Sequence, residues 1–592
     1  MASNTSIPIN QSTGASSLLA VSHSLLSIIF LLSLVTLPRH GMAAEAKAIQ
    51  ETPASMKSRR LSLGSRADPI EQKRPAEVPD DATLEAAGAR IGKVIIRPLD
   101  VFDTGRADED NWLFRTANRL HINTRESTLA DRLLFREGDA YLGRLLEESE
   151  RLLRDTRYLY DAAVRPIRYA DGVVDVEVVT RDVWTLNPGV SFGRKGGKST
   201  SGVELEELNL LGRGSQINFK QLNEVDRDIT SARFVDRQLG SSWWALELEH
   251  SDFSDGGAER FLLEHPFYAL DTRWAGGVSL YDTDRIDSRY DQGKRVGEYA
   301  VDNRYRSAWF GYSSGLQDNL VTRWSFGITS DDRNFSAVPG GTLKTIVPRD
   351  RKLVYPWIGV EWQENDFRAL RNRDQIERTE DFQYGWSAGV KLGYSTTGLD
   401  ADRNAFIFSS HAGKGFDLGR DRSLLLAATL EGRYEDGQFA DTLLSTSARY
   451  YHRQSERRLF FAGLAVDAGE RLDADRELML GGDTGLRGYP LRYQGGQGRW
   501  LLTLEQRAFT NWYPFRLVHV GAAAFVDVGG TWGRDPFASN KHEILGDVGV
   551  GLRLGNSRSA LGNVLHIDLA FPVNGDKSLK SMQVTIETKR SF

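Results

Sequence analysis

The fold of this chain is decided by its alternating segments, and the clearest of them is VHVGAAAFVDVG, at residues 518–529. Apolar side chains occupy every second position from Val518 to Val528, and the positions between them include His519, Asp527 and several small residues. Successive side chains of a β-strand point to opposite faces, so this pattern predicts a strand with one apolar and one polar face.

Segments of about ten residues with the same alternation recur from Val183 to Phe592, and that stretch contains no convincing helical pattern. Clear examples are residues 273–280, 323–329, 424–433, 500–507, 548–554 and 565–571. Tryptophan and tyrosine recur within them, as in the aromatic girdles of membrane barrels. A soluble sandwich also alternates, but its strands are usually shorter and its apolar face is the inner one.

We therefore predict a mainly β fold, an antiparallel transmembrane β-barrel over residues 183–592. A closed barrel is the only all-β structure that satisfies every backbone polar group in lipid. At roughly 25 residues for each strand and its loop, this stretch predicts about 16 strands, within the even-numbered range of outer-membrane barrels.

The composition agrees with this class of protein. Glycine accounts for 57 of the 592 residues and aromatic residues for 10%. The long apolar run Leu25–Leu37 has 13 residues, fewer than the roughly 20 that a spanning helix needs, which excludes a helical membrane protein. A net charge of −5 shows no basic excess, so we expect no nucleic-acid partner. The absence of cysteine excludes disulfides, thiolate catalysis and cysteine-ligated metals.

The N-terminal region is typical of an exported protein. Leu25–Leu37 has the length of a signal-peptide apolar region and is followed by small-x-small cleavage candidates, although no Lys or Arg precedes Arg39. We predict a signal peptide over residues 1–44. Residues 45–88 contain four prolines and charges of both signs, which predicts a disordered linker.

Residues 89–182 predict a small α+β domain. Residues 91–99 form one strand pattern, and leucines at helical spacing follow from Tyr141, with acidic residues on the other side. Two further strand patterns, residues 163–169 and 173–180, are joined by Asp171-Gly172. An Asp-Gly pair between two strands is a strong hairpin signal.

One glycine-rich segment, GGDTGLRGYP at residues 481–490, lies between two strand patterns. Its core, Leu486-Arg487-Gly488-Tyr489, resembles the V/L-R-G-F/Y loop signature of the outer-membrane assembly-factor superfamily, which includes BamA, TamA and the two-partner-secretion transporters and is also called the bacterial surface antigen family. Phe525-Val526-Asp527-Val528-Gly529 matches the F-x-D-x-G strand signature of that superfamily.

The N-terminal α+β domain resembles the POTRA domain of the same superfamily. The segment FREGDAY at residues 135–141 resembles its G-D-x-Y entry to the second helix, and residues 157–161 and 171–176 fit its closing hairpin. The aromatic C-terminus, Phe592, looks like the sorting signal of outer-membrane barrels, although Arg590 departs from the usual apolar residue. The resemblance covers residues 91–592 and implies a member with a single POTRA domain.

The resemblance implies that the loop folds back into the barrel and that Arg487 contacts Asp527 on the inner wall. The residues agree with this, because a guanidinium offers a carboxylate a planar, two-pronged match. Glycines flank the arginine and permit close approach. The predicted loop-to-wall lock comprises Leu486, Arg487, Gly488, Tyr489, Phe525, Asp527 and Gly529, with Glu505 and Arg507 completing a charge network in the lumen. The alternative is that Arg487 is an ordinary exposed loop arginine.

The function implied by the resemblance is the insertion or translocation of polypeptides at the bacterial outer membrane, with the POTRA domain in the periplasm. Its partners would be outer-membrane lipid, an unfolded client captured by the POTRA domain, and periplasmic chaperones or accessory subunits.

We expect no enzymatic activity, cofactor or metal site. We interpret the G-x-S-x-G match at residues 311–315 as a hairpin turn, because no helix pattern follows it. The alternative is a passive pore or a structural surface barrel without a polypeptide client.

Overall fold

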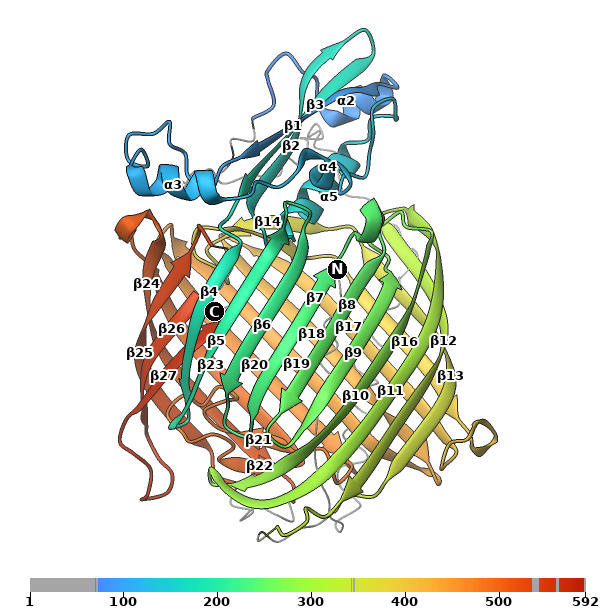
Figure 1. Cartoon of the computed structure of the whole chain (residues 1–592), viewed down its shortest axis with the longest axis vertical. Helices are drawn as coiled ribbons and strands as arrows, with labels where there is room; N and C mark the ends of the chain where they lie inside the picture. The colour runs from blue at the N-terminus through green and yellow to red at the C-terminus, as the bar shows by residue number, and fades with distance from the viewer. Residues whose placement is uncertain are drawn as a thin grey trace, which may run out of the picture.

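The computed structural model describes residues 70, 73–341, 343, 347–534, 542–559 and 564–589. The predicted signal peptide, most of the predicted linker and the predicted sorting residue Phe592 lie outside the described residues. The described chain forms a small α+β domain seated on one end of a β-barrel (Figure 1). We call the barrel end beside this domain the near end and the opposite end the far end.

Within the described residues, no helix is both long enough and apolar enough to cross a membrane.

The small domain is built on a sheet of order β1-β3-β2, whose strands are β1 (Arg90–Leu99), β2 (Leu159–Ala170) and β3 (Val173–Asp182). β1 is parallel to β3, and β2 is antiparallel to it. Asp171 and Gly172 connect β2 to β3 with φ values of 52° and 76°, as a two-residue turn with the right-handed twist of a hairpin requires. Leucines of α4 (Glu126–Ala130) and α5 (Gly143–Arg154) pack with the β3 valines in one core.

Two helices of this region were not predicted. α2 (Asp81–Ala86) lies within the predicted linker, so that prediction is wrong at its C-terminal end. Asp80 caps α2 by accepting a hydrogen bond from the Thr83 amide, and Leu84 is buried in the domain core. α3 (Trp112–Leu120) stands between β1 and α4. A helix of six residues is too short to show a helical period, which is why composition alone misassigned α2.

The barrel closes on itself through antiparallel neighbours. Along the described chain its strands are β4 (Leu186–Lys195), β5 (Lys198–Leu210), β6 (Ser215–Asn223), β7 (Asp228–Asp236), β8 (Ala245–Phe253), β9 (Gly256–His265), β10 (Trp274–Asp291), β11 (Lys294–Gln317), β12 (Leu320–Ser336), β13 (Arg351–Glu364), β16 (Ser387–Ser395), β17 (Ala405–Gly419), β18 (Arg422–Glu435), β19 (Gln438–Ser455), β20 (Arg458–Glu470), β23 (Gly498–Phe509), β24 (Val518–Trp532), β25 (Leu545–Asn556), β26 (Val564–Pro572) and β27 (Gln583–Lys589). Two small hairpins, β14 (Phe367–Arg371) with β15 (Thr379–Gln383) and β21 (Leu478–Leu480) with β22 (Gln494–Gly496), stand apart from this ring. Short 3₁₀ turns are η1 (Leu239–Ser241), η2 (Thr397–Leu399) and η3 (Pro514–Arg516).

The described residues form 20 barrel strands, so the prediction of about 16 is wrong. The reason lies in the turns. Several hairpins use only two residues, such as Gln292-Gly293 and Asp436-Gly437, both with positive φ throughout. Such turns match the twist of paired strands, and they bring the mean length of a strand with its turn down to about 20 residues instead of the roughly 25 assumed from typical barrels.

The wall has one apolar and one polar face, as the alternation predicts. Leu504, Val526, Val548 and Phe571 stand opposite one another on four adjacent strands, and all are exposed on the outer surface. The neighbouring positions Thr503, Asp527 and Asp547 face inward and the aspartates are fully buried. The segment at residues 311–315 lies within strand β11 rather than in a turn, so that detail of the prediction is wrong.

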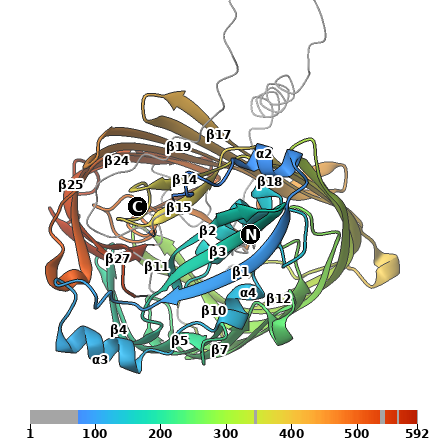
Figure 2. The same cartoon turned by 90° about the horizontal axis from the view of Figure 1, so that it is seen from above.

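Two segments between barrel strands turn into the barrel instead of forming plain connections. The near-end hairpin, residues 365–386, connects β13 to β16 and contains β14 and β15. The far-end loop, residues 471–497, connects β20 to β23 and contains β21 and β22. Figure 2 shows β14 and β15 within the ring of strands, beneath the small domain.

Candidate functional site

The far-end loop carries Arg487 to the inner wall formed by β23, β24, β25 and β26. The Arg487 guanidinium donates to Asp527 through Nε at 2.7 Å and through Nη2 at 3.0 Å, a two-pronged contact. The side chains of both residues are almost completely buried. The predicted contact between Arg487 and Asp527 is therefore present in the structure, and the alternative of an exposed arginine is wrong.

Further wall groups surround the same guanidinium. Its Nη1 donates to Glu505 at 3.2 Å and to Asp568 at 3.3 Å. The carbon centre of the guanidinium lies 3.3 Å from the centre of the Phe525 ring, where the negative face of the ring attracts a cation. Removing one member of such a buried set leaves an uncompensated charge, which costs about 3–5 kcal/mol.

The residues beside Arg487 fix the loop through polar contacts of their own. The Gly488 amide donates to Asp547 at 2.9 Å. The Tyr489 hydroxyl donates to the Asn574 carbonyl at 2.9 Å and receives the Gly546 amide at 3.1 Å. Leu486 and Tyr489 are fully buried in one apolar cluster with Leu480 and Leu545. All four residues of the Leu486–Tyr489 motif are therefore engaged by the wall.

Glycines are required where the loop meets the wall. Gly485 has φ +115°, and a side-chain carbon there would lie 2.3 Å from Leu501. A side-chain carbon at Gly488 would lie 2.7 Å from Asp547, and one at Gly529 would lie 2.7 Å from the Trp500 carbonyl oxygen. The two predicted site glycines therefore allow close approach: Gly488 lies on the loop against Asp547 of the wall, and Gly529 lies on the wall, where a side-chain carbon would be 3.1 Å from Leu480 of the loop.

The predicted charge network is present and is larger than expected. Arg507 donates from Nε to Glu505 at 3.0 Å, and Arg553 donates to the same carboxylate at 3.3 Å. Arg553 also donates to Asp568. Asp547, Arg553 and Asp568 were not predicted as site residues, although the alternation of their strands already placed them on the polar face.

Arg507 extends the network to the near-end hairpin. Its Nη1 donates to the Arg373 carbonyl at 2.6 Å. Next to it, Asp374 accepts from the Tyr451 hydroxyl at 2.8 Å and from Arg449 at 3.1 Å. A continuous set of polar contacts therefore joins the near-end hairpin to the far-end loop along the inner face of β23.

The near-end hairpin also packs through an apolar side chain, Ile376, which is buried. It belongs to a cluster contributed by several barrel strands: Leu425, Tyr451, Leu459, Phe461, Phe509 and Val564. A side-chain carbon at Gly555 would lie 2.9 Å from Ile376, so the hairpin tip lies directly against β25.

The small domain is fastened to this hairpin. Arg154 of α5 donates to both carboxylate oxygens of Asp381, at 2.8 Å and 2.7 Å. Arg378 donates to the Leu159 carbonyl at 2.8 Å. Glu148, on the polar side of α5, is buried and accepts from the Leu270 amide between β9 and β10. The polar side of α5 therefore faces the barrel.

The closure of the barrel between β27 and β4 is its weakest pairing. Among the described residues these strands share one pair, Ile586 opposite Arg194. β26 and β27 share seven pairs, and β4 and β5 share ten. The far-end loop lies against both sides of this seam. The Tyr489 hydroxyl donates to the Asn574 carbonyl in the β26–β27 connection, and a side-chain carbon at Gly196, in the β4–β5 turn, would lie 2.1 Å from the Leu491 nitrogen.

Comparison with known proteins finds remote structural likeness. No protein-family model and no curated protein matches the chain. BamA from Haemophilus ducreyi lacking POTRA domains 1–3 is 14% identical, with 85% of each chain covered and a TM-score of 0.34. CdiB from Escherichia coli is 13% identical over 86% of this chain and 77% of that chain, with a TM-score of 0.43. CdiB from Acinetobacter baumannii is 12% identical over 86% and 74%, with a TM-score of 0.40.

Identities of 12–14% with TM-scores of 0.34–0.43 assign no family and no function.

Proposed function

We propose that the chain is an outer-membrane barrel of the BamA/TamA type that inserts or translocates polypeptides, and that the far-end loop locks its seam. The observation that carries the proposal is the buried contact of Arg487 with Asp527, on the strands that precede the seam. The loop and strand motifs that led to this contact resemble the signatures of the outer-membrane assembly-factor superfamily.

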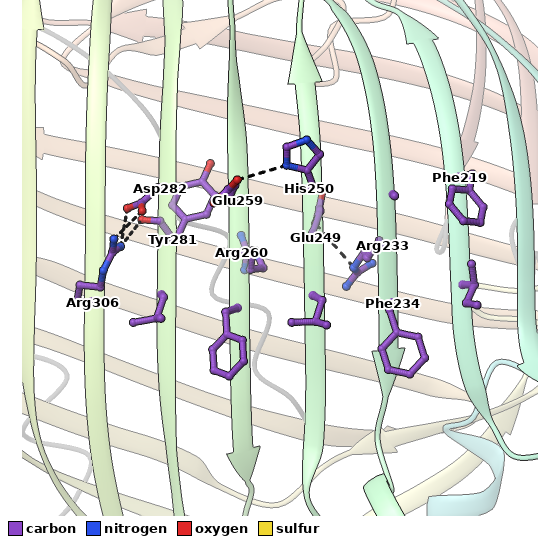
Figure 3. Close-up of a pocket in the computed structure, with 15 residues that line it drawn as sticks. Phe219, Arg233, Phe234, Glu249, His250, Glu259, Arg260, Tyr281, Asp282 and Arg306 are labelled. Atoms are coloured by element: carbon purple, nitrogen blue, oxygen red, sulfur yellow. Dashed lines mark hydrogen bonds and ion pairs between the residues drawn. The ribbon is translucent and has the colours of Figure 1, made fainter.

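The membrane position is supported by the outer face of the wall. Phe234, Leu248, Phe261 and Leu280 stand opposite one another in an apolar row. The next outward-facing row toward the far end contains His250, Glu259 and Asp282. Figure 3 shows this change, with His250 paired to Glu259 and Arg306 paired to Asp282. An apolar band bounded by charged residues is typical of a lipid-facing wall.

The lock is supported by what the far-end loop contacts. Asp527, Asp547 and Asp568 belong to β24, β25 and β26, on one side of the seam, and Gly196 belongs to the β4–β5 turn on the other. A loop held on both sides would keep the one-pair closure of β27 and β4 shut. Release of Arg487 would free the loop and allow the seam to part.

The small domain is proposed to act as a POTRA domain that captures the client. β1 and β2 are the edges of its sheet, and an extended peptide binds such an edge by adding a strand. The domain contacts the near-end hairpin, which in turn contacts Arg507. A passive pore would need an open lumen, but the far-end loop and the near-end hairpin both enter the lumen. This favours a gated barrel.

The proposal is tested by complementation of a strain that lacks the chain. Arg487→Ala should leave a heat-stable, membrane-inserted barrel that fails to restore the missing client in the outer-membrane proteome. Arg422→Ala, at an exposed arginine of β18, is the matched control and should restore it. Full restoration by Arg487→Ala would remove the loop from the mechanism, and altered small-solute permeability without a missing protein would indicate a passive pore.

A further inference from the structure

Helix α3 presents an exposed apolar face at the rim of the barrel. Trp112, Leu113 and Leu120 are 72%, 52% and 68% exposed. Successive residues of a helix are rotated by about 100° around its axis. Trp112, Leu113 and Leu120 therefore lie, with Thr116, within one arc of roughly 100°, which is the width of an amphipathic face. Arg115 and Arg119 occupy the next arc, and the remaining arc, which contains Phe114, faces the protein.

The protein-facing arc of α3 is held against the near-end turns of the barrel. Phe114 stacks on Phe102, with ring centres 4.0 Å apart, and both pack beside Leu517 of the β23–β24 connection. Just before the helix, Asp108 pairs with Arg516 and Glu109 pairs with Arg558. The start of α3 is therefore fixed to two barrel turns.

The end of α3 is fixed as well. His121 lies 3.1 Å from Asp182, which also accepts the Thr124 amide at 2.7 Å. Asp182 is the last residue of β3, just before the barrel begins. Anchors at both ends set the rotation of the helix, so the exposed arc has a defined direction.

The position of α3 is continuous with the lipid-facing wall. Figure 2 shows α3 at the edge of the ring, beside β4, rather than over the barrel opening. The connection that α3 packs on carries two further exposed aromatic residues, Trp512 at 65% and Phe515 at 84%. Tryptophan at the end of a barrel wall is typical of a membrane interface.

We propose that α3 is an interfacial anchor that lies in the near leaflet of the membrane spanned by the barrel. Trp112, Leu113 and Leu120 would enter the boundary between headgroups and acyl chains, and Arg115 and Arg119 would meet lipid phosphates. Interfacial helices combine these two features: an apolar face, and arginines whose charged ends reach the headgroups. The inference rests on the proposed membrane position of the barrel, and it adds a lipid contact beside the first strand of the seam.

The absence of cysteine in the sequence allows the test by single-site labelling of the full chain. An environment-sensitive fluorophore is attached to a single cysteine introduced at position 113, 115 or 120. Each labelled protein is then inserted into phosphatidylethanolamine–phosphatidylglycerol vesicles, prepared either with or without lipids that carry a quencher on the acyl chain. Labels at Leu113→Cys and Leu120→Cys should be quenched by the lipid and protected from iodide. A label at Arg115→Cys should show more iodide quenching and less lipid quenching.

A label on the wall, at Val548→Cys, separates the two proposals. If positions 548, 113 and 120 all report lipid, the anchor is supported. If position 548 reports lipid while positions 113 and 120 report water, the anchor is wrong and that surface is free for a protein partner. If position 548 also reports water, the membrane position of the barrel itself fails. Trp112→Asp combined with Leu113→Asp should move the label at position 120 into water while the label at position 548 stays in lipid.

Discussion

The two segments that enter the barrel differ in how they are held. The far-end loop is held by ion pairs spread around the wall: Arg487 with Asp527, Asp475 with Arg351, Asp473 with Arg433, and Arg492 with Asp226. The near-end hairpin has ion pairs as well, Asp381 with Arg154 and Asp374 with Arg449, but its tip also carries the buried Ile376, which packs in a larger apolar cluster of the barrel wall. One set of charges, from Arg507 through Glu505 to Arg487, joins the two segments.

The difference suggests two different roles. A buried ionic contact contributes little net stability, because desolvation offsets attraction, but it specifies one geometry and is costly to break in part. An apolar cluster contributes stability in proportion to the area removed from water. We interpret the near-end hairpin as the firmly packed element and the far-end loop as the element that switches between engaged and released.

The largest expected effect is from Arg487→Ala. Asp527 would remain buried without its main cation, so the engaged state of the far-end loop should lose about 3–5 kcal/mol. Hydrogen exchange of residues 481–497 should accelerate sharply, while exchange in the near-end hairpin stays close to that of the natural protein. Arg487→Ala with Asp527→Ala should recover part of the stability lost by the engaged loop, because no buried charge is then left without its partner, but it should not recover the activity. If exchange in the loop is unchanged by the single variant, the ionic anchor is not what holds it.

Ile376→Ala should affect the opposite segment. Truncating this buried side chain should cost about 2–4 kcal/mol, since it removes apolar contacts and leaves a cavity. Protease sensitivity and hydrogen exchange should rise in residues 365–386 while residues 481–497 remain protected. An exposed apolar residue, Leu399→Ala, serves as control. Equal loosening of both segments would contradict the distinction between them.

Arg507→Met tests the link between the segments. Methionine keeps much of the side-chain volume but removes the donors to Glu505 and to the Arg373 carbonyl. A double-mutant cycle with Arg487→Ala, read by exchange of the far-end loop, should give an interaction of about 0.5–3 kcal/mol. Additive effects would show that the two segments act independently.

A pH dependence is also expected for the near-end hairpin. Burial, with Asp374 nearby, raises the pKa of Glu380 to about 8 from its ordinary 4.5. The folded hairpin therefore binds more protons than the unfolded one between these values, and its stability should fall as pH rises from about 4.5 to about 8. Hydrogen exchange should be slower at pH 5 than at pH 8 after correction for intrinsic rates. Glu380→Gln should remove the dependence.

A feature could be predicted from the sequence where its signal lies in a short stretch of residues, and it was missed where the signal depends on distant parts of the chain. Alternation is local, so it placed Asp527 inward and Val526 outward without any knowledge of the fold. The Arg487 contact was found because glycines and a recognisable motif surround it. The strand number was missed because it depends on turn lengths, and the alternation of a long strand does not show where a two-residue turn interrupts it.

The near-end hairpin was not predicted, and its anchors explain why. Ile376 is a single apolar residue in a polar stretch, and its partners, from Leu425 to Val564, are far away in the sequence. α3 was missed for a related reason. Its Trp112 and Leu120 are largely exposed, so their pattern can be interpreted only once the helix is placed at the barrel rim.

A disulfide across the seam tests the central claim most directly. Arg194→Cys and Ile586→Cys face each other across β4 and β27, and the chain contains no other cysteine. Oxidation should abolish client insertion or translocation, and reduction should restore it, while the control pair Val526→Cys and Val548→Cys, across β24 and β25, should have no effect. Full activity with the seam fully cross-linked would contradict a barrel that works by opening there.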